Sequence, residues 1–275
     1  MTETSVSILG CGWLGFPLAK ALVSAGYRVR GSTTSSEKLS MLEQGGIEPY
    51  LITLNPTLKE SANASFFSSE IMVINIPPGR KRENVESFYT TQIREILSQQ
   101  PTERLIFISS TSVYPDCNQE VQETDSLALR AADKTLKASG KALLMAEDLV
   151  RNYSPQATIV RFCGLMGPDR HPGRFLAGRK LPSSGQAPIN FIHLGDCIAI
   201  LKLIVQEEKW GELFNACADS HPTKEKFYTL AAEKLALDPP KFSAEATPSY
   251  KKVNNDKLKQ HLGYTFIFPD PTQAL

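Results

Sequence analysis

The stretch that decides the fold is Val6-Ser7-Ile8-Leu9-Gly10-Cys11-Gly12-Trp13-Leu14-Gly15. Its first four residues form a short, mostly apolar run that predicts a strand ending at Gly10. Apolar residues then recur with helical spacing from Leu14 to Val23, and Gly26 ends this predicted helix. A G-x-G-x-x-G motif between a strand and a helix, inside a unit of ~30 residues, indicates a dinucleotide-binding turn.

Each glycine of this turn has a separate physical role. Gly10 permits the tight turn, Gly12 lets the backbone approach a diphosphate, and Gly15 lets the helix lie close to the strand. The diphosphate then rests on N–H groups at the positive end of the helix. The alternative is a glycine-rich turn that binds nothing. We predict cofactor contacts from the whole segment: Gly10, Gly12, Trp13, Leu14 and Gly15.

Short apolar runs alternate with helical patterns along the first 163 residues. The later runs lie near residues 27–30, 49–52, 71–74, 105–108 and 157–162. Nearly continuous apolar strands separated by helices are typical of a parallel sheet covered on both faces. We therefore predict an α/β fold, a doubly wound Rossmann-type parallel sheet with a small C-terminal substrate or lid region. The strands end in small or polar residues, which is where such sheets bind ligands: Gly10, Ser32-Thr33-Thr34, Asn75, Ser109-Ser110.

Two domains follow from the change in pattern. The NAD(P)-binding Rossmann domain is predicted to comprise residues 1–163 plus 190–217, and parts of 190–217 are expected to add strands to its sheet. A small substrate-side region is predicted from residues 164–189 plus 218–275. Its first part is rich in Gly, Pro and Arg, which is typical of a loop. A long helix is expected over residues 127–151.

The composition excludes several classes of protein. The chain has 275 residues, 41% of them hydrophobic, and a net charge of +1, so nothing predicts binding to nucleic acid or to a membrane surface. Five scattered cysteines without a C-x-x-C pair predict reduced thiols, and neither a disulfide framework nor a metal site. The absence of a basic leader and of a long apolar run predicts a cytoplasmic protein.

The end of the second strand bears on the choice of cofactor. An acid at this position usually bonds the ribose 2′-hydroxyl of NAD, but none stands between Tyr27 and Ser36. An acid-free pocket accepts a 2′-phosphate without repulsion, which favours NADP, with NAD as the alternative because no Arg stands among the hydroxyl-rich residues 32–36. A helix N-cap at Ser35 or Ser36 is a structural alternative. The predicted contacts are Ser32, Thr33, Thr34, Ser35 and Lys38.

Four motifs occur in the order found in one family. They are Gly10-x-Gly12-x-x-Gly15, then Ile106-Phe107-Ile108-Ser109-Ser110-Thr111-Ser112-Val113-Tyr114, then Val160-Arg161-Phe162-Cys163-Gly164-Leu165-Met166-Gly167-Pro168, then Phe191-Ile192-His193-Leu194-Gly195-Asp196. Together they resemble the extended short-chain dehydrogenase/reductases, the NAD-dependent epimerase/dehydratase family. The short glycine motif and the length are most similar to the atypical YeeZ-like branch.

The resemblance implies roles for particular residues. Ser110, four residues before Tyr114, would hydrogen-bond a substrate oxygen, and His193 and Asp196 would form a corner on the substrate side. It also implies a homodimer formed through paired helices. The residues that would line the cofactor path from the ends of the fourth, fifth and sixth strands are Asn75, Ile76, Pro77, Ser109, Phe162 and Cys163.

The sequence departs from the family at its acid–base pair. The family carries a Tyr followed four residues later by a Lys, because a phenol of pKa ~10 needs a nearby ammonium to exchange protons near neutrality. None of the eight tyrosines has a Lys at that spacing. Anchoring the helix on Glu147 puts Ser139 at the Tyr position and Leu143 at the Lys position, and anchoring on Lys141 puts Lys137 at the Tyr position.

Catalysis therefore needs another group, or the site is not catalytic. Ser110, Tyr114, Lys141 and His193 are the candidates. Their alternatives are ordinary: a hydroxyl that caps backbone, an aromatic packed under a turn, an exposed helix lysine and a satisfied histidine at a strand end.

Basic residues after the sixth strand suggest the charge of the substrate. Arg170 and Arg174 are suited to clamp an anionic small molecule, with a solvated loop as the alternative. Arg80-Lys81-Arg82 is interpreted as a solvent-facing helix entry or a contact to a cofactor phosphate. Two functions remain open. One is an NADP-linked oxidoreductase or epimerase acting on a small hydroxylated or sugar-nucleotide-like substrate, and the other is a non-catalytic NAD(P)-binding redox sensor.

Overall fold

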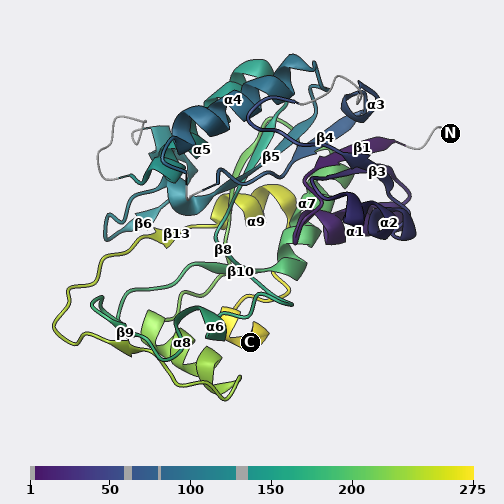
Figure 1. Ribbon diagram of the computed structural model, residues 1–275. Coiled ribbons are helices and arrows are strands. Elements are labelled where there is room, and N and C mark those ends of the chain that lie inside the picture. The colour runs from purple at the N-terminus through teal and green to yellow at the C-terminus, as the bar shows by residue number, and fades with distance from the viewer. Residues whose placement is uncertain (1–3, 59–63, 80–81, 128–135) are drawn as a thin grey trace. The chain divides into compact units, whose positions relative to one another are not determined.

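A seven-stranded sheet forms the centre of the computed structural model, which describes residues 4–58, 64–79, 82–127 and 136–275 (Figure 1). The strand order is β11-β7-β5-β4-β1-β2-β3, and the strand pairs from β3 to β5 run parallel. The crossover order around β1 is that of a doubly wound Rossmann-type sheet, as predicted. The strands are β1 Ser5–Leu9, β2 Arg28–Thr33, β3 Glu48–Leu51, β4 Ile71–Ile74, β5 Leu105–Ser110, β7 Thr158–Phe162 and β11 Leu213–Ala216.

The central strands are buried on both faces, which explains their continuous apolar sequence. Every residue of β4 is buried, and its Ile71 and Val73 pair with Val6 and Ile8 of β1. Helices therefore cover the sheet, and α4 and α5 lie side by side on one face (Figure 1). The helices of this part of the chain are α1 Gly15–Ser24, α2 Leu39–Gln44, α3 Ala64–Phe67, α4 Val85–Ser98, α5 Ala138–Tyr153 and α7 Leu194–Gln206.

The helix expected over residues 127–151 is shorter at its start. Residues 128–135 lie outside the described residues, and α5 begins at Ala138 after an extended Lys137. A Cβ at Gly140 would lie 2.5 Å from the carbonyl oxygen of Ser112. The first turn of α5 is therefore fixed by a close backbone contact with the chain after β5, which no periodicity reveals.

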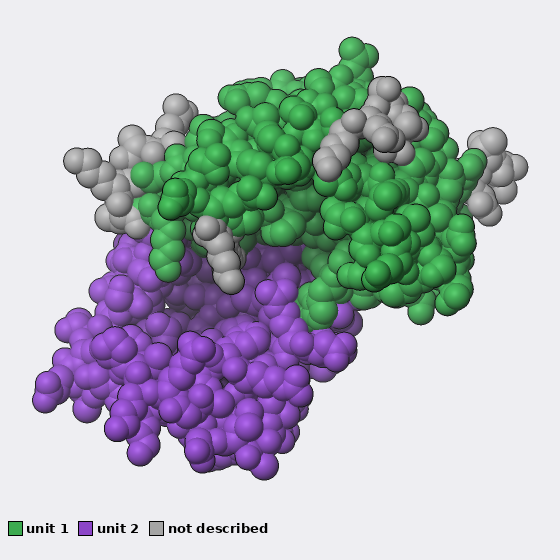
Figure 2. Space-filling model, in the orientation of Figure 1, with its two compact units in different colours: residues 1–113, 130–161, 200–213 green, residues 114–129, 162–199, 214–275 purple. Residues whose placement is uncertain are grey.

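The chain forms two compact units, coloured separately in Figure 2. The first comprises Met1–Val113, Arg130–Arg161 and Ile200–Leu213, and the second comprises Tyr114–Leu129, Phe162–Ala199 and Phe214–Leu275. The predicted domain boundaries stay predictions.

Among its described residues, the second unit contains three two-stranded parallel sheets. The expectation that parts of residues 190–217 add strands to the main sheet is confirmed for β11, whereas β10 pairs with β8 instead. The sheets are β8 Gly164–Met166 with β10 Phe191–His193, β9 Lys180–Leu181 with β12 Lys241–Phe242, and β6 Glu120–Val121 with β13 Lys252–Val253. The remaining helices are α6 Gly173–Leu176, α8 Lys224–Glu233 and α9 Asp256–Leu262.

A buried cluster of Met166, Ile189, Phe191 and Phe227 forms a core inside this unit. The rings of Phe191 and Phe227 lie 5.0 Å apart, so the β8–β10 sheet rests on packed side chains as well as on its few backbone bonds. In the part of the chain that the structure describes, no helix has the length and apolar composition to cross a membrane.

Candidate functional site

The glycine turn after β1 is closed by backbone that leaves no room for side chains. Gly10 has a φ of +103°, and a Cβ on it would lie 2.6 Å from the carbonyl oxygen of Asn75. A Cβ on Gly15 would overlap the carbonyl oxygen of Gly10. The side-chain amide of Asn75 donates to that same oxygen at 2.9 Å, so β4 holds the turn from β1 in place. Glycine is therefore required at residues 10 and 15 by the fold itself.

Gly12 differs from Gly10 and Gly15, because the space that its side chain would occupy is open. A Cβ there would meet nothing within 4 Å, and the residue is exposed. The helix α1 that follows has no side-chain cap at Leu14 and no acidic residue in its first turn. The N–H groups of a helix's first turn lack partners within the helix and carry partial positive charge. An open space beside an uncapped helix N-terminus fits the diphosphate of a dinucleotide.

The hydroxyls at the end of β2 fall into two groups. Ser32 is buried and accepts the N–H of Gly10 at 2.9 Å, so it positions the glycine turn. Thr33 is buried and accepts the N–H of Ser35 at 3.2 Å. Thr34 and Lys38 are exposed, and Ser35 is half-buried without a side-chain cap bond to the following short helix. The groups accessible to a cofactor at this strand end are therefore Thr34, Ser35 and Lys38.

The segment after β4, which begins with Asn75 and Ile76, lies against the glycine turn. The carbonyl oxygen of Ile76 accepts the hydroxyl of the buried Tyr89 at 2.9 Å, while Pro77 is exposed. Arg80 and Lys81 lie outside the described residues. Asn75 and Ile76 are thus fixed on one side by the glycine turn and on the other by α4.

A buried ion pair lies at the carboxyl end of β5. The hydroxyl of Ser109 donates to Oε1 of Glu147 at 2.6 Å, and Arg161 donates to both carboxylate oxygens of Glu147, at 2.9 and 2.5 Å. The side chains of Glu147 and Arg161 are 3% and 1% exposed. Ser109 therefore ties β5 to α5 and β7. The sequence assigns Glu147 no role beyond the alignment of this helix with the family's acid–base pair. The missed signal was Arg161, a lone charge inside an apolar strand.

Ser110 and Lys141 belong to the same unit as this ion pair. In the sequence, Ser110 follows Ser109, and Lys141 lies on α5 before Glu147. The oxygen of Ser110 accepts the N–H of Ser112 at 3.2 Å, and its hydroxyl can in addition donate one hydrogen bond. Lys141 is half-buried in the first turn of α5, next to the Gly140 that packs against Ser112. The structure thus brings the start of α5 against the turn that carries Ser110.

The other candidates belong to the second unit. Tyr114 is 1% exposed and its hydroxyl donates to Oδ1 of Asn215 at 2.9 Å, so it is a packed aromatic with a satisfied hydroxyl. Phe162 and Cys163 are buried, and the N–H of Cys163 donates to the carbonyl of Ala216 at 3.0 Å. These two residues stay predicted cofactor contacts.

His193 ends β10 beside the C-terminal part of the chain. Its Nδ1 accepts the N–H of Gly195 at 3.1 Å, and its ring lies 4.1 Å from that of Phe268. Burial lowers the pKa of His193 below its ordinary value, an effect that the neighbouring charge of Asp196 opposes.

The predicted anion-binding arginines lie around a short helix of the second unit. Arg170 and Arg174 are exposed, and Arg174 lies on α6. Burial lowers the pKa of the neighbouring His171, and the charges of Arg174 and Lys234 lower it further. The positive charges of Arg174 and Lys234 therefore act on the same place, around His171. Together they create a local positive potential that suits an anion.

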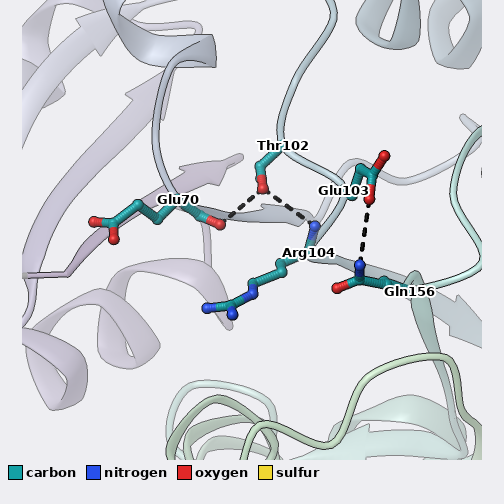
Figure 3. Close-up of a pocket in the computed structure, with 5 residues that line it drawn as sticks. All are labelled: Glu70, Thr102, Glu103, Arg104 and Gln156. Atoms are coloured by element: carbon teal, nitrogen blue, oxygen red, sulfur yellow. Dashed lines mark hydrogen bonds between the residues drawn. The ribbon is translucent and has the colours of Figure 1, made fainter.

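A polar hollow of about 470 Å³ lies elsewhere in the first unit, and Figure 3 shows its lining. It is lined by Glu70, Thr102, Glu103, Arg104 and Gln156, residues that precede β4, β5 and β7. The hydroxyl of Thr102 donates to the carbonyl of Glu70, and Gln156 donates to Glu103. This hollow lies at the amino ends of the strands, away from the glycine turn, and its groups bond one another.

Residues 6–217 match the model of the NAD dependent epimerase/dehydratase family, and the chain therefore belongs to this family. Protein YeeZ of Escherichia coli strain K12 is 34% identical over 273 residues, which are 97% of each chain, and places the chain in the YeeZ-like branch. The cytoplasmic location and the homodimer expected from the sequence stay predictions.

Solved structures of low sequence identity share the fold. The structure of MoeE5 in complex with UDP-glucose and NAD has a TM-score of 0.74 and 17% identity, covering 98% of this chain and 95% of that one. UDP-glucose 4-epimerase of Thermotoga maritima, solved with UDP-glucose, has a TM-score of 0.74 and 16% identity, covering 98% and 96%.

Proposed function

We propose that this protein binds NADP(H) and acts as an oxidoreductase or epimerase on a small hydroxylated, sugar-nucleotide-like substrate. The observation that carries the proposal is the open space over Gly12 beside the uncapped start of α1. The family supports the use of a nicotinamide cofactor, and the MoeE5 structure was solved with NAD, which keeps NAD as the alternative cofactor.

The preference for NADP rests on the end of β2. Thr34, Ser35 and Lys38 are accessible there, and no acid stands between Tyr27 and Ser36 to repel a 2′-phosphate. A Lys⁺ near that phosphate contributes a charge-assisted contact that NADH cannot use.

Lys38→Glu tests this preference directly. We expect it to weaken NADPH binding about tenfold, a change of ~1.4 kcal/mol, and to leave NADH binding nearly unchanged. Lys209→Glu is the matched control, because the backbone carbonyl of Lys209 accepts the hydroxyl of Thr158 at the amino end of β7, the opposite strand end from the cofactor. Equal weakening of both nucleotides by Lys38→Glu, measured by titration calorimetry, would remove the NADP assignment.

The proposed chemistry uses few groups of the protein. The bound nicotinamide supplies or accepts the hydride. Ser110 donates its hydroxyl proton to the substrate oxygen and so polarises the bond that reacts, and Lys141 at the start of α5 supplies positive charge to the same region. Arg170 and Arg174 bind anionic groups of the substrate.

UDP-glucose is a suitable probe of the substrate class. We expect it to bind protein loaded with NADP⁺, and we expect Ser110→Ala to reduce turnover at least tenfold while NADP⁺ affinity stays within about twofold. If UDP-glucose does not bind the loaded protein, the sugar-nucleotide part of the proposal fails.

A non-catalytic redox sensor is the second candidate, and the burial of Tyr114 favours it. The hydroxyl of Tyr114 is used by Asn215, so this phenol does not replace the missing family Tyr. A sensor would bind NADPH and NADP⁺ with affinities that differ several-fold and would not turn over UDP-glucose or another hydroxylated substrate. Detectable hydride transfer between the cofactor and such a substrate would contradict the sensor function.

A further inference from the structure

The corner at His193–Asp196 is tied to the C-terminal part of the second unit. Asp196 is fully buried, and its carboxylate accepts the hydroxyl of Tyr264 at 2.7 Å and the N–H groups of Ile267 at 2.7 Å and Phe268 at 3.2 Å. A buried carboxylate needs such donors, because unmet lone pairs away from water are costly. Asp196 therefore fixes the segment Tyr264–Phe268.

This segment places an aromatic ring on His193. The rings of Phe268 and His193 lie 4.1 Å apart at an angle of 57°. A Cβ on Gly195 would lie 3.2 Å from Nδ1 of His193 and 3.5 Å from the ring of Phe268. The imidazole is therefore confined between the start of α7 and the C-terminal segment.

The hydrogen bond at Nδ1 decides which ring nitrogen carries the proton when His193 is neutral. Nδ1 accepts the N–H of Gly195 at 3.1 Å, and a ring nitrogen that accepts a hydrogen bond carries no proton. The proton of the neutral ring must then be on Nε2. Burial lowers the pKa of His193, so the neutral form prevails near neutral pH, although the charge of Asp196 opposes this effect.

Such a ring donates a hydrogen bond and does not accept a proton. Nε2 already carries one, and protonation of Nδ1 would break the bond from Gly195. General-base catalysis by His193 would therefore cost the contact that orients it.

We propose that Asp196 and Phe268 are positioning residues that hold the ring of His193 in place, with its proton on Nε2 as a fixed hydrogen-bond donor to a substrate oxygen. The donor role rests on the proposed function, whereas the proton arrangement does not.

Nitrogen-15 NMR of the imidazoles in the full-length protein tests the arrangement. We expect His193 to carry its proton on Nε2 near neutral pH. We expect Phe268→Leu and Tyr264→Phe to give a mixture of tautomers and to raise the pKa of His193 toward its ordinary value. His171 is an internal control, since its Nδ1 makes the same bond to the N–H of Gly173 at 3.1 Å. A proton on Nδ1 in the wild type, or no response of His193 to either variant, would overturn the proposal.

UDP-glucose binding to NADP⁺-loaded protein tests the donor role. Gln can place an N–H close to the position of Nε2, so His193→Gln should bind within about threefold of the wild type, and His193→Leu about tenfold more weakly. Equal losses in the two variants would overturn the donor role. A wild type that does not bind UDP-glucose would overturn both this role and the proposed substrate class, while the NMR result decides the proton arrangement separately.

Discussion

Three glycines of one motif have different physical duties, and the structure separates them. Gly10 and Gly15 are required because backbone atoms of Asn75 and Gly10 occupy the space of a side chain. Gly12 faces open space and is required only when a ligand approaches. The first two glycines therefore serve the fold, and the third serves the proposed binding of the cofactor.

Substitutions at Gly12 and Gly15 should separate stability from binding. Gly12→Glu should leave the unfolding temperature of the cofactor-free protein within about 2 °C and reduce NADPH affinity at least ~100-fold, because a carboxylate would occupy the diphosphate position. Gly15→Ala should cost about 2 kcal/mol of stability without any ligand, because its Cβ overlaps the carbonyl of Gly10. Thermal unfolding and titration calorimetry measure the two effects. A stable Gly15→Ala protein, or unchanged NADPH binding by Gly12→Glu, would contradict this assignment.

At the scale of elements, the ion pair of Glu147 and Arg161 fastens α5 to the sheet beside Ser110. Both side chains are almost completely buried, and Ser109 supplies a further hydrogen bond. A buried pair of this kind does not by itself add much stability, but removing one partner leaves an unpaired charge inside the protein.

Breaking this pair should be more costly than replacing it. Glu147→Gln should lower the free energy of unfolding by about 3–5 kcal/mol, and the double variant Glu147→Leu with Arg161→Met should recover a large part of that loss. Ser109→Ala, which keeps the pair, is expected to cost only ~1 kcal/mol. Urea denaturation measures all three. If Glu147→Gln stays within about 1 kcal/mol of the wild type, the pair does not fasten α5.

At the scale of the whole molecule, the pKa values of three histidines are all shifted below the ordinary value. Burial is the largest cause that lowers the pKa of His171, of His193 and of His221. The unfolded chain, whose histidines titrate near 6.5, then binds protons at a higher pH than the folded chain. The stability from these groups is complete above that pH and is lost as the pH falls through their lower folded values.

We therefore expect the free energy of unfolding to fall between about pH 7 and pH 5. Carboxyl groups such as Glu48, whose pKa is lowered chiefly by the hydroxyl of Tyr50, contribute their own loss only at lower pH. Urea denaturation across this range checks the prediction. A variant with Gln at all three histidine positions should show a flatter profile, and a flat profile in the wild type would refute the histidine account.

The sequence predicted most of the main sheet because its evidence was local. Apolar runs, helical spacing and the glycine motif all lie within short windows, and the strands from β1 to β5 follow them. The sequence left open which strands within residues 190–217 join the main sheet, because β10 is placed by its register with β8, which a single strand does not encode.

Side-chain roles were less accessible, because they depend on distant partners. Ser32 bonds the N–H of a residue 22 positions away, Ser109 a carboxylate 38 positions away, and Tyr114 an amide 101 positions away. Ser32 and Ser109 were predicted as cofactor contacts from their places at strand ends. Their hydroxyls bond the protein, which only the folded chain reveals.

The central claim is that a dinucleotide diphosphate rests on the first turn of α1 above Gly12. A crystal structure of the protein grown with NADPH tests it most directly. The account predicts density for the diphosphate within hydrogen-bond distance of the N–H groups at Gly12–Gly15 and the adenosine beside Thr34 and Lys38. NADPH density at another place, or an empty turn at saturating NADPH, would contradict the account.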